Sequence, residues 1–130
     1  MIKLSFIVPV YDVEDYVEQC VKSLCNQTIN DIKRRGKWLL FDLDNYYLLS
    51  HLRMEGRYFY KNKNDEHLKH EHVIFNFSDE TELRYLDSRK FGKMHLIEKK
   101  DAYNQKPLNE LGLEPWDDNL TISYLKEKYK

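Results

Sequence analysis

The predicted fold follows from one stretch of sequence, Trp38-Leu39-Leu40-Phe41-Asp42-Leu43-Asp44-Asn45-Tyr46-Tyr47-Leu48-Leu49-Ser50-His51-Leu52. Its two runs of apolar and aromatic residues, 38–43 and 46–52, each have the length and composition of a β-strand. Between them lies Asp44-Asn45, a pair that tolerates the positive φ of a two-residue hairpin turn. The stretch therefore predicts an antiparallel β-hairpin.

Further strands are predicted toward the C-terminus. Segments 57–61, 72–77, 82–86 and 93–98 are short, rich in β-forming residues and separated by polar or glycine-containing turns. Residues 99–118 predict an irregular connection, and residues 120–128 predict a terminal helix capped by Asn119 or Thr121. Short strands in series, joined by hairpin turns, indicate an antiparallel sandwich or barrel.

The start of the chain has a different character. Residues 4–10 predict a buried strand, with Pro9 at its end or on a sheet edge. Asp12 can cap a helix that ends near Asn26-Gln27. A strand and a helix followed by an antiparallel meander is not one common topology. We therefore predict two pieces, 1–27 and 28–130.

The composition fits one soluble globular domain, with 130 residues of which 42% are hydrophobic and 33% charged. No apolar run is long enough to cross a bilayer and no signal peptide is evident, which favours the cytoplasm and excludes a membrane partner. Cys20 and Cys25 predict ordinary thiols, because no Cys-x-x-Cys pair exists. Residues 31–100 carry 15 basic and 12 acidic side chains, which suits either a nucleic-acid face or an ordinary solvated surface.

Five blocks of sequence after residue 28 occur in the order and spacing of a known family. They are KRRGKWLLF (33–41), SHLRMEGR (50–57), KHEHVIF (69–75), LRYLDSRKFG (83–92) and LGLEP (111–115). Residues 28–130 thus resemble the N-terminal domain of the formamidopyrimidine-DNA glycosylases. The resemblance implies a mainly β fold with flanking helices, in which two antiparallel sheets form a β-sandwich, and it implies a role in base excision repair.

Three residues match a Met, an Arg and a Phe that in this family fill the hole left by a damaged base, namely Met54, Arg89 and Phe91. A flexible Met and a flat Phe can wedge between bases, and an Arg can pair with the orphaned base opposite. The alternative is that Met54 and Phe91 belong to the core and Arg89 forms a surface salt bridge. Within their blocks we expect the wedge.

Several cations are expected to meet DNA. The resemblance gives Lys37 a contact with the damaged nucleotide and its phosphate, and Arg34, Arg35 and Arg53 are candidate phosphate contacts. The alternative for all four is an ordinary solvated surface.

His70 and His72 match a Lys-His-x-His block that lies near the DNA backbone in the family. Alternating residues of a strand point the same way, so we expect both rings to face one groove. No third ligand is evident beside this pair, so no metal and no other cofactor is expected.

Catalysis in the resembling family starts from an N-terminal proline followed by a glutamate. This sequence begins Met1-Ile2-Lys3, and the nitrogen of Pro9 is an amide. We therefore expect binding to duplex DNA, including DNA with abasic or oxidised-base lesions, without glycosylase activity. The alternatives are residual abasic-site lyase chemistry by imine formation at Lys37, and a folded gene-fusion remnant with no activity.

Residues 3–27, with Phe6-Ile7-Val8-Pro9-Val10-Tyr11, resemble the start of family 2 inverting glycosyltransferases but lack the aspartates that bind metal there. We expect the strand at 4–10 to pair into the sandwich and the helix after it to cover an open face. An unpaired edge would instead favour self-association.

Overall fold

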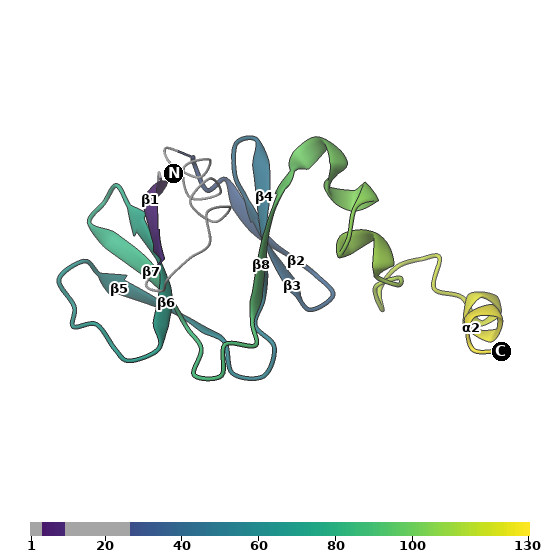
Figure 1. Ribbon diagram of the computed structural model, residues 1–130. Helices are drawn as coiled ribbons and strands as arrows, with labels where there is room; N and C mark the ends of the chain where they lie inside the picture. Colours follow the sequence, from purple (N-terminus) through teal and green to yellow (C-terminus); the bar gives the residue numbers. More distant parts are fainter. Residues whose placement is uncertain (1–3, 10–26) are drawn as a thin grey trace.

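The computed structural model describes residues 4–9 and 27–130 and has two four-stranded antiparallel sheets (Figure 1). Sheet one has the order β1 (Leu4–Pro9), β6 (Glu71–Phe77), β7 (Thr81–Leu86) and β5 (Arg57–Asn62). Sheet two has the order β2 (Asp31–Arg35), β3 (Trp38–Asp42), β4 (Tyr46–His51) and β8 (Lys93–Glu98). The expected mainly β fold with two antiparallel sheets is confirmed.

The first strand joins the sandwich as expected. β1 pairs antiparallel with β6, with Ile7 opposite Phe75 and Pro9 opposite Val73. β1 is an edge strand and Pro9 is its last residue, and both positions are compatible with a residue that has no N–H to donate. The helix expected after Asp12 lies outside the described residues, as do both cysteines.

The hairpin predicted around Asp44-Asn45 is formed by β3 and β4, with Asp42 opposite Tyr47. Neither turn residue has positive φ, contrary to the expectation for this turn. The Asp44 carboxylate accepts hydrogen bonds from the Thr28 backbone N–H (3.1 Å) and from the side-chain amide of Asn30 (3.2 Å). The turn therefore also holds the chain that leads into β2.

β2 was not predicted because its sequence, Asp-Ile-Lys-Arg-Arg, has no alternating apolar pattern. Four of its five residues are exposed. Full backbone pairing with β3, from Asp31 opposite Asp42 to Arg35 opposite Trp38, makes it a strand. As an edge strand rich in charge, it resists pairing with other chains.

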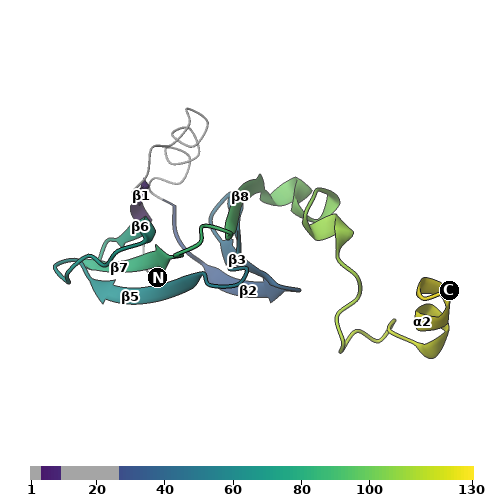
Figure 2. The same cartoon turned by 60° about the horizontal axis from the view of Figure 1, so that its bottom comes forward.

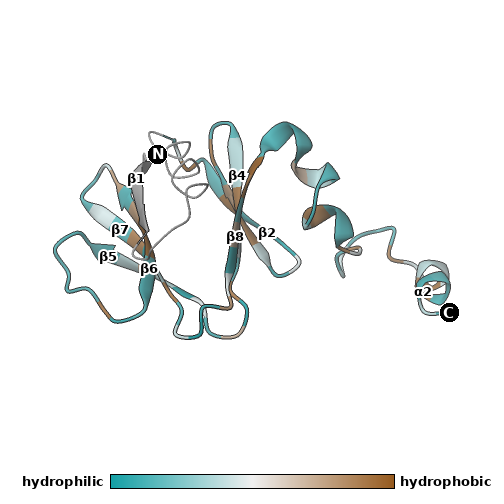
Figure 3. Cartoon of the chain, viewed as in Figure 1, coloured by the Kyte–Doolittle hydropathy of each residue, from teal (hydrophilic) through white to brown (hydrophobic). Residues whose placement is uncertain are grey.

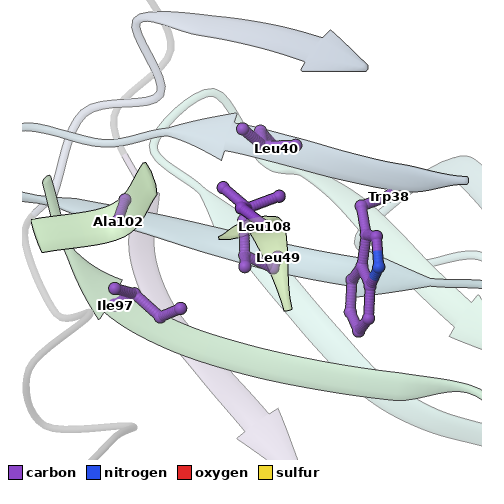
Figure 4. Packing of buried hydrophobic residues seen from close by; sticks show 6 residues of the cluster. All are labelled: Trp38, Leu40, Leu49, Ile97, Ala102 and Leu108. Atoms are coloured by element: carbon purple, nitrogen blue, oxygen red, sulfur yellow. The ribbon is translucent and has the colours of Figure 1, made fainter. Parts of the chain in front are cut away.

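The central strands of sheet two, β3 and β4, are covered on both faces, which explains their nearly continuous apolar runs. Facing sheet one is the cluster Phe41, Leu43, Leu48, Phe75 and Phe77. On the other face lies the cluster Trp38, Leu40, Leu49, Ile97, Ala102 and Leu108, where short 3-10 helices cover the strands (Figure 4). Figure 3 shows the hydrophobic colour concentrated in the strands and these helices, whereas the hairpin turns are mainly hydrophilic.

The connection after β8 contains these two helices, η1 (Lys99–Asn104) and η2 (Leu108–Glu110), and then runs to α2 (Ile122–Lys128). The predicted cap of α2 is confirmed, because the Thr121 hydroxyl accepts a hydrogen bond from the Tyr124 N–H (3.1 Å). α2 buries none of its residues and stands away from the sandwich in both views (Figures 1 and 2). Within residues 4–9 and 27–130, no helix is long and apolar enough to span a membrane.

Candidate functional site

Two loops meet at one end of the sandwich, β4–β5 (52–56) and β7–β8 (87–92), and they lie side by side at the bottom of Figure 1. Met54 on the first loop is 76% exposed and Phe91 on the second is 53% exposed. Glu55 joins the loops, because its carboxylate forms an ion pair with the Arg89 Nε (3.1 Å) and accepts a hydrogen bond from the Ser88 hydroxyl. The structure thus brings the loops of Met54, Arg89 and Phe91 together, and the side chains of Met54 and Phe91 are exposed to solvent.

The Asp87 carboxylate holds the second loop in shape. It accepts hydrogen bonds from the backbone N–H groups of Arg89 (3.2 Å), Lys90 (3.0 Å) and Gly92 (2.9 Å), and from the Tyr85 hydroxyl (2.7 Å). Burial opposes ionisation of this carboxyl, but these bonds, the Gly92 and Tyr85 bonds foremost, outweigh burial and hold its pKa below the ordinary value. An ionised, fully bonded carboxylate therefore defines the loop that carries Phe91.

His70 and His72 also contact Asp87, the first residue of the β7–β8 loop. The His70 carbonyl accepts a hydrogen bond from the Asp87 N–H (3.0 Å), and the His72 Nε2 lies 2.5 Å from the Asp87 carbonyl oxygen. The side chain of His72 is buried, and the pairing register shifts between Glu71 and Val73. The two rings lie 6.3 Å apart, and of the two only His70 is partly exposed. No cluster of three possible metal ligands occurs in the described part of the chain.

Cations gather at the same end of sheet two. The strand register places His51 opposite both Trp38 and Lys93, so the turn with Lys37, the loop with Arg53 and the start of β8 are neighbours. Burial lowers the pKa of His51, and the positive charges of Arg53, Lys37 and Lys93 lower it further. The Nδ1 of His51 accepts a hydrogen bond from the Arg53 N–H (3.0 Å), which fixes the start of the Met54 loop.

Arg34 and Arg35, two of the expected phosphate contacts, are bound within the chain. The Arg35 guanidinium donates to the Glu114 carboxylate (3.2 Å) and to the Gly112 carbonyl (2.6 Å). The Arg34 guanidinium lies 3.7 Å from the Glu114 carboxylate and 4.9 Å from the centre of the Trp116 ring. Both arginines therefore fasten the segment before α2 to the β2–β3 turn, and Lys37 beside them is exposed.

Several residues at this end of the sandwich were not predicted from the sequence, namely His51, Glu55, Tyr85, Asp87 and Lys93. A signal for two of them was present. Glu55 stands beside Met54, and Asp87 opens the stretch that contains Arg89 and Phe91, in the blocks that carry the resemblance. An acidic residue next to an expected DNA contact is unfavourable toward phosphate, which points to a structural role.

The fold and this end of it define the class of protein: a two-sheet antiparallel β-sandwich that presents two exposed apolar side chains beside a cluster of cations. Residues 9–94 match the family described as the formamidopyrimidine-DNA glycosylase N-terminal domain, and the chain belongs to that family.

Curated relatives and solved structures agree with this assignment. The chain is 51% identical to the formamidopyrimidine-DNA glycosylase of Shouchella clausii over 115 residues, which is 88% of this chain and 42% of the relative. It is also 51% identical to that of Bacillus licheniformis, over 87% of this chain and 41% of the relative. The structure of Lactococcus lactis Fpg with DNA containing an abasic site matches with a TM-score of 0.87 and 34% identity, over 98% of this chain and 48% of that one. The Lactococcus complex with Fapy-dG-containing DNA matches with a TM-score of 0.88, 34% identity, and 98% and 49% coverage.

The chain spans about two fifths of the length of the curated relatives it matches. The glycosyltransferase-like start expected for residues 3–27 is not supported by these comparisons. The family match begins at residue 9, and the likeness to the Lactococcus structures covers nearly the whole chain.

Proposed function

We propose that this domain binds duplex DNA and prefers sites where a base is missing or oxidatively damaged, by inserting Met54 and Phe91 into the stack. The observation that carries the proposal is their exposure on two loops that Glu55 joins, next to Lys37, Arg53 and Lys93. The relatives whose structures match were solved with DNA containing abasic or Fapy lesions.

Insertion of Met54 and Phe91 requires the base stack to open. Unstacking a step costs a few kcal/mol, and apolar wedges offset that cost by filling the gap. At an abasic site one base is already absent, so less stacking is lost and the wedges gain more than on intact DNA. Arg89 is 55% exposed and carries donors that suit the base left opposite the gap. Preference for a lesion follows without any bond being broken.

Affinity depends on a different set of residues. Lys37, Arg53 and Lys93 flank the wedge loops and can neutralise phosphates on either side of the insertion point. Binding through them releases counterions, so affinity falls steeply as salt rises. Preference between duplexes should change much less with salt, because wedging involves no phosphate.

The proposal includes no base excision by these 130 residues. None of the three prolines in the sequence, Pro9, Pro107 and Pro115, is followed by glutamate, the pair with which the family's chemistry begins. Lys37 is exposed at a turn rather than held in a dry pocket, which is a poor setting for an activated amine. We therefore propose a lesion-binding role, and trapping of an imine on an abasic duplex with borohydride would contradict it.

The test is fluorescence anisotropy with a duplex that carries an abasic-site analogue and with the undamaged duplex, each at two salt concentrations. The wild type should bind both duplexes more weakly at high salt and should prefer the abasic one. Met54→Ala and Phe91→Ala should remove most of that preference and leave the salt dependence unchanged. Ile122→Ala is the matched control, because Ile122 is 73% exposed on α2, far from the loops. No binding at low salt, or equal loss of preference in the control, would refute the proposal.

A further inference from the structure

Tyr85 on β7 has a buried hydroxyl beneath the two wedge loops, 52–56 and 87–92. Its side chain is 6% exposed, and its hydroxyl donates to the Asp87 carboxylate at 2.7 Å. Burial, and then the bond to Asp87, raise the pKa of this hydroxyl well above the ordinary tyrosine value. The group is therefore a permanent donor to the carboxylate that shapes the Phe91 loop.

The same oxygen lies close to a glycine of each loop. A Cβ added at Gly56 would lie 2.6 Å from the Leu52 carbonyl oxygen and 2.8 Å from the Tyr85 oxygen, and one added at Gly92 would overlap the Tyr85 oxygen. Gly56 follows Met54 by two residues, and Gly92 directly follows Phe91. The hydroxyl thus lies between the Met54 loop and the Phe91 loop and leaves no room for a side chain at position 92, while at position 56 it crowds a side chain together with the Leu52 backbone.

We infer that the Tyr85 hydroxyl is a positioning group, which fixes the separation of the two wedge loops so that Met54 and Phe91 enter the same gap in DNA. The inference rests on the proposed function. A phenylalanine would bury the same ring without the cost of a buried hydroxyl, so packing alone does not account for the oxygen. A wedge made from two separate loops works only when their spacing is set before DNA arrives, since any ordering on binding weakens it.

The chain provides a matched control in Tyr58 on β5. Its ring lies 5.2 Å from that of Tyr85, and its hydroxyl is also buried, 2.6 Å from the Ser50 hydroxyl on β4. That bond joins the two sheets through strand residues. Tyr58→Phe therefore removes a comparable buried hydroxyl from the same core and leaves Asp87 with all of its partners.

The experiment compares Tyr85→Phe, Tyr58→Phe and the wild type by two measurements. Amide hydrogen exchange on the free protein follows the Lys90 and Gly92 N–H groups, which Asp87 binds. Anisotropy gives the ratio of affinities for abasic and undamaged duplexes and its dependence on salt. We expect Tyr85→Phe to speed exchange at these amides and to lower the ratio, each by about tenfold, the effect of one hydrogen bond to a charged group. Tyr58→Phe should change neither, and the salt dependence should stay the same in both.

Equal exchange rates and equal affinity ratios in the two variants would overturn the inference. If the wild type shows no preference for the abasic duplex, but Tyr85→Phe alone speeds exchange, then Tyr85 does hold the loops and the proposed function is what fails. Asp87→Asn keeps the shape of the acceptor and removes its charge. It should reproduce the Tyr85→Phe result, and it replaces that variant if Tyr85→Phe does not fold.

Discussion

Gly92 offers a test of the loop architecture that needs no DNA. A Cβ at this position would overlap the Tyr85 hydroxyl oxygen and lie 2.9 Å from the adjacent ring carbon and 3.0 Å from the Asp87 carboxylate. Gly92→Ala must therefore push the ring aside and break the bond from Tyr85 to Asp87. Gly112 is the matched control, because a Cβ there meets nothing within 4 Å.

The expected cost follows from these two effects. Crowding in a packed region costs about 1–3 kcal/mol, and losing a buried hydrogen bond to a charged group adds about 1.5–3 kcal/mol. Gly92→Ala should thus lower the free energy of unfolding by about 2.5–6 kcal/mol, a large part of the total of about 5–15 kcal/mol typical of a domain. Gly112→Ala should stay within about 0.5 kcal/mol of the wild type.

Urea denaturation followed by circular dichroism measures both variants, with an unchanged slope required for a valid comparison. The double variant Gly92→Ala/Tyr85→Phe adds a check, because removing the oxygen relieves the worst overlap. Tyr85→Phe should cost less in the Gly92→Ala background than in the wild type. A loss below about 1 kcal/mol for Gly92→Ala, or strict additivity in the double variant, would show that the hydroxyl does not occupy this space.

Three further predictions concern charge. Arg84 is fully buried between Glu82 (2.8 Å) and Glu71 (3.5 Å), so Arg84→Met should lower the free energy of unfolding by about 3–5 kcal/mol in urea, because both buried carboxylates lose their arginine partner while His67 still contacts Glu71. Lys37→Ala should reduce the slope of log affinity against log salt by about 1 in DNA titrations, equally for damaged and intact duplexes. Folding lowers the pKa of His51 below 6.5, so the unfolded chain binds the proton more readily and stability should fall as pH drops through that value. Thermal melts between pH 8 and pH 5 should show this fall, and His51→Gln should make it smaller without removing it, because burial lowers the pKa of His95 as well; a pH response identical to that of the wild type would contradict the assignment.

Buried central strands could be predicted from the sequence alone. The runs of β3 and β4 could be identified because both faces of these two strands are covered, so nearly every residue in them must be apolar. The place of the two-residue turn at Asp44-Asn45 and the cap at Thr121 could be identified because each depends on neighbours in the chain. The backbone conformation of the turn was not identified, because neither turn residue has the positive φ that the local rule expects.

Which distant residues meet depends on the tertiary structure. β2 is a strand because β3 supplies its hydrogen bonds, and no pattern in its own charged sequence predicts it. Glu55 and Arg89 are 34 positions apart, and they form an ion pair because the sandwich brings the β4–β5 and β7–β8 loops to one end. His72 is buried below a loop because β6 is an inner strand of sheet one and nearly all of its residues are buried. Contacts between distant segments depend on sheet order and register, which a run of residue types does not specify.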